Sequence, residues 1–222
     1  QEFSNLTPDD YQFVLALFSQ RLITGCRELE GRLRDGLDAF LRERGEDLIN
    51  RIVRIVRERH EKYQNTIYQL EPDLKESPGG LRDHLAAGWL RKLRGELAFS
   101  PYSDEEIRAA YRYLKQLRIL VHLKAKRPDN RLTHRLQEEI RRYVGYEEGP
   151  TDPGVEALMH DYFVHARVLF SYCTAMVRAA RPLEHSRQMG LQFMPQIRNM
   201  TDILVVFQHA SAESGALPDN VR

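Results

Sequence analysis

Apolar residues recur at helical spacing along most of this chain, and no stretch shows the alternation of apolar and polar residues that indicates a half-buried strand. The pattern predicts about eight helical segments separated by short polar breaks. The expected segments are 8–23, 27–44, 45–63, 81–93, 103–125, 132–144, 155–180 and 195–214. We therefore expect an all-α fold, an irregular antiparallel helical bundle of about seven to eight helices.

Local signals mark several of these boundaries. Gly25 and Gly45 are expected to end the first and second helices, because glycine is a weak helix former. Ser103, followed three residues later by Glu106, predicts a capping box at the start of a long helix. Two helices have a clear predicted apolar stripe: Leu81, Leu85, Trp89 and Leu93 on one, and Leu158, Tyr162, His165, Leu169 and Met176 on the other.

Residues 70–83, which we call the elbow, follow neither a helix nor a strand pattern; they read Leu-Glu-Pro-Asp-Leu-Lys-Glu-Ser-Pro-Gly-Gly-Leu-Arg-Asp. Pro72 and Pro78 each remove a backbone donor and disfavour helix in the residue before them, so we expect a built loop. The loop leads into a helix whose first backbone N-H groups are expected to be free for an anion, with Lys75 and Arg82 nearby. The elbow therefore predicts a binding site or a docking surface.

The charges of the elbow allow two interpretations. In one, its acidic and basic side chains neutralise one another, and the segment is only a connector. In the other, Lys75 and Arg82 reach toward a ligand while Glu71 and Asp83 orient them. We favour the second interpretation, because a connector alone would not require this density of charge.

Composition narrows the class of protein. The chain has 222 residues, of which 42% are hydrophobic, so it can bury a sizeable core. Its 33 basic and 32 acidic residues nearly cancel, which gives no overall attraction to nucleic acid or to an anionic membrane. With two cysteines, no signal peptide and no apolar run long enough to span a bilayer, we expect a cytoplasmic protein. A first residue that is Gln1 instead of methionine fits an excised fragment.

Other candidate sites are weaker. Cationic side chains recur along one face of the helix over 103–125, where they form either a solvated face or a binding face; they are Arg108, Arg112, Lys115 and Arg118, with His122 one turn further. The dipeptide His160-Asp161 contains metal-ligand residue types, but a structural hydrogen bond between Asp161 and His165 is the simpler explanation. His60 and Tyr63 are expected to brace the elbow through hydrogen bonds. We predict no catalytic and no metal-binding residue.

The elbow and its flanks resemble the bifunctional PII uridylyltransferase/uridylyl-removing enzymes of bacterial nitrogen signalling, over roughly residues 17–175. The upstream residues that carry the resemblance are Arg21 to Gly25, His60, Tyr63, Thr66 and Tyr68. The downstream residues are Trp89, Arg118, His122, Arg131, Leu132, Gln137, Gly145, Tyr146, Val155, Glu156, Met159 and Tyr162.

The resemblance implies a particular domain arrangement. Such enzymes carry a nucleotidyltransferase domain with a glycine turn and an Asp-x-Asp pair, followed by a helical domain, an HD hydrolase domain and ligand-sensing domains. It implies that residues 1–25 are the C-terminal edge of the nucleotidyltransferase domain and that residues 26–222 are the helical domain. Glu71-Pro72-Asp73 is not assigned as the catalytic pair, because its Gly-Gly follows it and no strand carries it. The isolated chain is expected to be inactive.

The resemblance also implies a reaction, the transfer of UMP from UTP to a tyrosine of a PII signalling protein, with Mg²⁺ in the full-length enzyme and no cofactor bound by this segment alone. Here Lys75, Arg82 and Arg118 would help to hold the nucleotide at the junction with the upstream domain, supported by Glu71 and Asp83. The expected partner is PII, with no nucleic acid and no membrane. The alternative is a non-catalytic regulatory helical module that binds a protein partner or a nucleotide.

Overall fold

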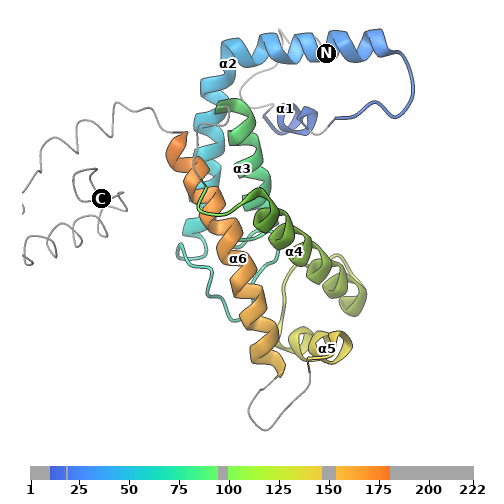
Figure 1. The fold of residues 1–222 in the computed structure, drawn as a ribbon, viewed down its shortest axis with the longest axis vertical. Coiled ribbons are helices and arrows are strands. Elements are labelled where there is room, and N and C mark those ends of the chain that lie inside the picture. The colour runs from blue at the N-terminus through green and yellow to red at the C-terminus, as the bar shows by residue number, and fades with distance from the viewer. Residues whose placement is uncertain (1–10, 19, 95–99, 147–153, 181–222) are drawn as a thin grey trace, which may run out of the picture. The chain divides into compact units, whose positions relative to one another are not determined.

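The fold was analysed in a computed structural model, which describes residues 11–18, 20–94, 100–146 and 154–180. In these ranges the chain forms six helices (Figure 1): α1 Tyr11–Leu17, α2 Arg27–Glu61, α3 Leu81–Arg94, α4 Asp104–Ala125, α5 His134–Val144 and α6 Gly154–Ala179. The predicted all-α class is confirmed, whereas the predicted count of seven to eight helices is corrected to six in the described residues. The helix expected over 195–214 lies outside those residues.

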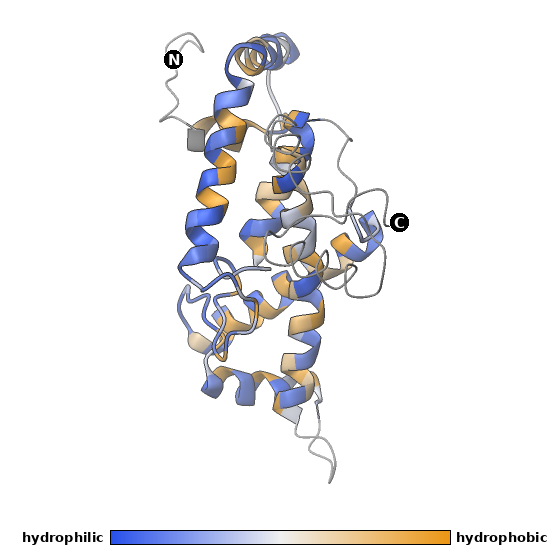
Figure 2. Cartoon of the chain, turned by 90° about the vertical axis from the view of Figure 1, so that its left-hand side faces the viewer, coloured by the Kyte–Doolittle hydropathy of each residue, from blue (hydrophilic) through white to orange (hydrophobic). Residues whose placement is uncertain are grey.

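The main reason for the lower count is α2, which runs without interruption through Gly45. A glycine in a helix interior costs only about 1 kcal/mol relative to alanine. The C-terminal half of α2 offsets that cost by burying apolar side chains, namely Leu48, Ile49, Ile52, Val53 and Val56. Figure 2 shows α2 as a largely hydrophilic helix with its apolar residues along one side.

The first helix ends at Leu17, although the sequence predicted an end near Ile23. Tight turns close it, because the N-H groups of Phe18 and Gln20 donate to carbonyls three residues earlier. Ile23 is 83% exposed, so no packing supports a longer helix at that point.

Helix α6 lies at the centre of the core and packs against α3, α4 and α5. The predicted apolar stripe on α6 is confirmed except at His165, which is only half-buried. The buried members include Leu158, Tyr162, Leu169 and Met176.

The apolar stripe predicted for α3 is confirmed except at Leu85, which is 37% exposed; Leu81 is buried, and Trp89 and Leu93 are partly buried against the core. The buried face of α3 also contains Ala86, Ala87 and Leu90. Small side chains allow close packing between helices, and α3 uses this face in its extensive contact with α6. Ala86 and Ala87 thus help to determine which face of α3 is buried. A sequence pattern based on large apolar residues gives these two alanines little weight.

Two helix starts follow their local signals. The Ser103 side chain accepts a hydrogen bond from the Glu106 N-H, and Glu106 accepts one from the Ser103 N-H, so the predicted capping box of α4 is confirmed. Thr133 caps α5 in the same way, through the Leu136 N-H. These caps fix the N-terminal ends of α4 and α5.

Candidate functional site

The elbow is a tightly hydrogen-bonded loop. Asp73 Oδ1 accepts the backbone N-H groups of Lys75 and Glu76, each at 2.8 Å. The Asp73 N-H donates to Ser77 Oγ at 2.9 Å, and the Ser77 N-H donates back to the Asp73 carbonyl at 3.0 Å. Asp73 is therefore occupied in shaping the loop.

A second segment, residues 130–132, holds the elbow from one side. The Leu74 N-H donates to the Asn130 carbonyl and the Leu132 N-H to the Pro72 carbonyl, both at 2.9 Å, around an antiparallel bridge between Asp73 and Arg131. The buried Gln137 amide ties the two segments together further, because its Nε2 donates to carbonyls on both of them. The elbow backbone is thus fixed to the start of α5.

The backbone N-H groups at the start of α3 are not free, which corrects the predicted anion site at that helix end. Those of Leu81 and Arg82 donate to carbonyls of the elbow at 3.0 Å, and that of Gly79 donates to Asp83 Oδ2 at 2.7 Å. The loop itself therefore satisfies the donors that an anion would use.

Asp83 is fully buried and anchors the elbow to α2. Its Oδ1 accepts from Arg59 Nη2 and lies 2.8 Å from His60 Nε2. A buried carboxylate needs such cationic or donor partners to offset the loss of its hydration. The predicted bracing role of His60 is confirmed, whereas the predicted orienting role of Asp83 is corrected, because its partners are not Lys75 or Arg82.

The same anchor reaches α6. Burial raises the pKa of the Cys173 thiol well above its usual range, and the nearby Asp83 carboxylate raises that pKa further. The ring of His60 lies against Phe170, with centroids 5.4 Å apart. Helices α2, α3 and α6 thus meet at one buried ionic group.

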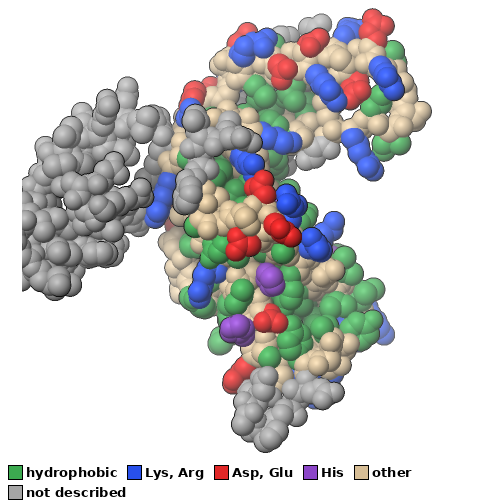
Figure 3. All heavy atoms as spheres, in the orientation of Figure 1, with side chains coloured by type: hydrophobic (Ala, Val, Ile, Leu, Met, Phe, Trp, Pro, Cys, Tyr) green, Lys and Arg blue, Asp and Glu red, His purple; other side chains and the backbone are tan. Residues whose placement is uncertain are grey.

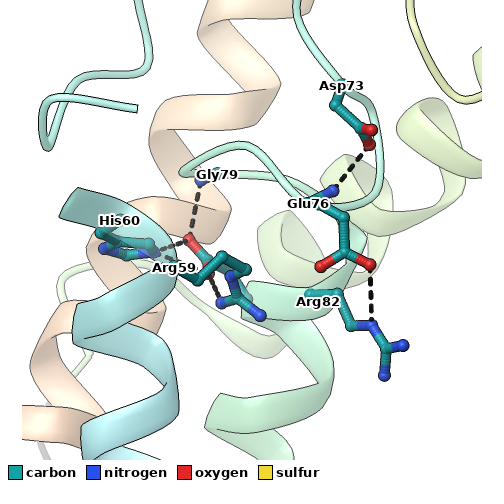
Figure 4. A network of polar contacts seen from close by, with 7 residues as sticks. Arg59, His60, Asp73, Glu76, Gly79 and Arg82 are labelled. Atoms are coloured by element: carbon teal, nitrogen blue, oxygen red, sulfur yellow. Dashed lines mark hydrogen bonds and ion pairs between the residues drawn. The ribbon is translucent and has the colours of Figure 1, made fainter. Parts of the chain in front are cut away.

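Glu76 is the carboxylate that contacts both cations of the elbow. Its Oε1 lies 3.5 Å from Lys75 Nζ and 3.3 Å from Arg82 Nε, and all three side chains are partly exposed. Figure 4 shows the terminal nitrogens of Arg82 directed away from Glu76. Glu71, which was expected to orient these cations, instead accepts the backbone N-H of His134 at 3.0 Å and caps α5.

Arg118 also lies beside the elbow. Its Nε donates to Asn130 Oδ1 at 2.7 Å, and His122 Nε2 lies 3.4 Å from the same oxygen. The Asn130 carbonyl accepts the N-H of Leu74, so Arg118 is linked to the elbow through Asn130.

Tyr63 contacts the elbow, as its predicted bracing role requires. It hydrogen bonds to Ser77, and burial raises the pKa of its hydroxyl above the usual value, with the charges of Asp73 and Glu76 raising that pKa further. The positive charge of Arg131 lowers the same pKa, so Arg131 lies within electrostatic reach of the hydroxyl. Glu76, Ser77 and Arg131 were not predicted as site residues, because their roles depend on how distant segments pair.

The remaining candidates stay apart from the elbow. Arg108, Arg112 and Lys115 are exposed on α4. Asp161 accepts a hydrogen bond from the Tyr146 hydroxyl at 2.5 Å and lies near its exposed neighbour His160, so the predicted bond to His165 is replaced by these contacts.

Within the ranges that the structure describes, no group of three or more His, Cys, Asp or Glu side chains is arranged to hold a metal ion, and no helix has the length and hydrophobicity needed to cross a membrane. Figure 3 shows basic and acidic side chains interspersed over the visible face.

Comparison with known proteins identifies the class of this helical chain. The sequence profile of the GlnD PII-uridylyltransferase family matches residues 47–177, which contain the whole elbow, the residues that anchor it and most of α6. The chain belongs to this family. No solved structure matches it significantly.

Several curated relatives carry the name bifunctional uridylyltransferase/uridylyl-removing enzyme. The protein from Vibrio cholerae serotype O1 is 34% identical over 153 residues, which is 64% of this chain and 17% of that protein. The protein from Cupriavidus pinatubonensis is 34% identical over 170 residues, 72% of this chain and 19% of that protein. The protein from Hydrogenovibrio crunogenus is 35% identical over 125 residues, 50% of this chain and 14% of that protein. The chain thus spans less than a fifth of the length of these relatives.

Proposed function

We propose that this chain is the helical part of an enzyme that transfers UMP from UTP to a protein, and that its elbow helps to hold the phosphates of the nucleotide. Lys75, Arg82 and Arg118 are the proposed nucleotide-binding residues. The family membership supports the reaction class. The main support for the role of the elbow is that Lys75 and Arg82 share the Glu76 carboxylate on a tightly hydrogen-bonded loop.

The charge balance of this group favours an anionic ligand. Lys75 and Arg82 carry two positive charges against the single negative charge of Glu76. Arg82 uses only its Nε in that contact, so its terminal nitrogens stay available for a bidentate contact to phosphate. Exposed ion pairs contribute little free energy, so a phosphate can compete with Glu76 at small cost.

Arg118 adds positive charge that no carboxylate within the described ranges neutralises. Its partner there is the neutral amide oxygen of Asn130. An arginine that is already held by an amide is pre-organised, which lowers the entropy lost when it binds an anion. In this proposal Glu71 and Asp83 act indirectly, by fixing the backbone of α5 and of the elbow.

Magnesium does not fit the described residues of this segment. Asp73 and Glu71 accept backbone hydrogen bonds, and Asp83 is enclosed by Arg59 and His60. Any Mg²⁺ that accompanies UTP would therefore be held by a part of the enzyme outside these residues.

The proposal includes a PII signalling protein as the acceptor, through its tyrosine hydroxyl, and a cytoplasmic location. It also retains the predicted boundaries, with residues 1–25 as the edge of an upstream nucleotidyltransferase domain and 26–222 as the helical domain. The chain alone is expected to be inactive. A regulatory helical module that binds a partner without chemistry is the competing function.

The test is the substitution of Lys75→Ala and Arg82→Ala in the full-length protein that contains this chain. Each variant should raise the KM for UTP and lower uridylyl transfer by about tenfold, because a hydrogen bond to a charged group contributes about 1.5–3 kcal/mol. Helical content should be unchanged, since both side chains are partly exposed. Arg34→Ala, which removes another partly exposed ion pair, is the matched control. Wild-type turnover in both elbow variants would exclude the proposed role and favour the regulatory module.

A further inference from the structure

Arg131 is an exposed arginine whose backbone is unusually well fixed. It forms the bridge with Asp73, and the hydrogen bonds on either side of it, from Leu74 to Asn130 and from Leu132 to Pro72, are both 2.9 Å long. Its own N-H donates to Asp129 Oδ1 at 3.0 Å. These contacts therefore fix the backbone from which the Arg131 side chain extends beside the elbow.

The guanidinium of Arg131 makes no hydrogen bond or ion pair to any residue that the structure describes. The arginines four positions before and after it differ in this respect. Arg127 Nη2 lies 2.7 Å from Asp129 Oδ2, and Arg135 Nη1 pairs with Glu139 Oε1. In a chain with nearly equal numbers of acidic and basic residues, an arginine at a fixed position without a carboxylate is available for an external anion.

Its surroundings connect Arg131 to the cations of the elbow. Asp73, Glu76 and Arg131 each lie within electrostatic reach of the Tyr63 hydroxyl, and the backbone bridge places Arg131 opposite Asp73. Glu76 in turn contacts Lys75 and Arg82. The Asp73 carboxylate faces two backbone N-H groups, which leaves it less available to pair with Arg131.

We propose that Arg131 is a further phosphate-binding residue of the elbow and contacts the same nucleotide phosphates as Lys75 and Arg82. This inference rests on the proposed function and names an additional residue of the same site. A planar guanidinium can donate two parallel hydrogen bonds to one phosphate group, which a lysine cannot do. Arg131 should therefore contribute to the affinity for the phosphates and not to recognition of the base.

The experiment measures the affinity of the full-length protein for UTP, UMP and uridine by calorimetry. Arg131→Ala should weaken UTP binding by about tenfold, or about 1.4 kcal/mol, and should leave uridine binding unchanged. Arg131→Lys should recover part of the loss, because it restores the charge but not the bidentate geometry. The controls Arg127→Ala and Arg135→Ala remove exposed, ion-paired arginines and should bind UTP within about twofold of wild type.

The outcomes separate this inference from the proposed function. Loss of UTP affinity in Arg131→Ala together with Lys75→Ala supports both. Unchanged UTP affinity in Arg131→Ala, with weakened binding in Lys75→Ala, overturns the inference and leaves the proposed function standing. An equal loss for uridine and UTP also overturns it, because the contact would then not be to phosphate. No effect of either substitution, or no UTP binding by the wild type, overturns both.

Discussion

Substitution of Gly79 by alanine is predicted to destabilise the elbow strongly. Gly79 has a φ of +77°, in the left-handed region, and its N-H donates to the buried Asp83 carboxylate. A Cβ at this position would lie 2.4 Å from the Ala166 carbonyl oxygen and 2.9 Å from its carbon, on the backbone of α6. Backbone atoms in a packed helix cannot move aside as the end of a flexible side chain can.

Two costs add in this substitution. A left-handed conformation costs a non-glycine residue about 1–2 kcal/mol, and overpacking a well-packed site costs about 1–3 kcal/mol. We therefore expect the free energy of unfolding to fall by about 2–5 kcal/mol in Gly79→Ala. With a urea dependence of about 2 kcal/mol/M, the unfolding midpoint should fall by roughly 1–2.5 M.

Gly88→Ala, on the helix α3 that follows the elbow, provides the matched control. A Cβ at Gly88 would meet no heavy atom within 4 Å, so alanine there should stabilise the helix by about 0.5–1 kcal/mol. Urea unfolding of both variants, followed by far-UV circular dichroism, measures the two effects with opposite signs. Equal midpoints for Gly79→Ala and wild type would refute the close contact between the elbow and α6.

Two further predictions concern buried polar groups. Asp83→Asn leaves Arg59 without its charged partner and should lower the free energy of unfolding by about 3–5 kcal/mol. Asp104→Asn, the control at an exposed pair with Arg91, should change that free energy little. Similar urea-unfolding midpoints for the two variants would contradict the role of Asp83 as the anchor. Burial lowers the pKa of His84 below its ordinary 6.5, so the unfolded chain takes up a proton first and stability should fall as the pH drops below about 6.5. His84→Phe should preserve the stacking on Tyr111 and reduce the pH dependence of the urea-unfolding midpoint. If the midpoint of this variant changed with pH as much as that of wild type, His84 would not be the cause of the pH dependence.

Local sequence signals predicted the fold well where the interactions that determine it join residues close together in the sequence. The capping box at Ser103 depends on residues three positions apart, and the stripe on α6 depends on apolar residues that recur every three to seven positions; both were correct apart from His165. Gly45 was misleading because packing of distant residues outweighs a small propensity cost. The first helix was predicted too long because the exposure of Ile23 depends on the tertiary structure.

The site was predicted less completely, because its contacts join separate parts of the chain. The sequence singled out the elbow and its two cations, and the structure brings Lys75 and Arg82 together. The sequence did not reveal that Glu76 would be the shared partner of these cations. It also did not reveal that Asp83 would pair with Arg59, which lies 24 residues earlier. Arg131 reaches the elbow only through its bridge to Asp73, which no local pattern predicts.

The central claim is that the elbow contacts the phosphates of a bound nucleotide. Photolabelling of the full-length protein with a UTP analogue that carries its reactive group on the γ-phosphate tests it directly, with mass spectrometry to locate the label. We expect labelled peptides from residues 70–83 or from the segment that contains Arg131, and we expect excess UTP to protect those peptides from labelling. Label that is found only elsewhere in the protein, and that UTP displaces, would contradict the claim.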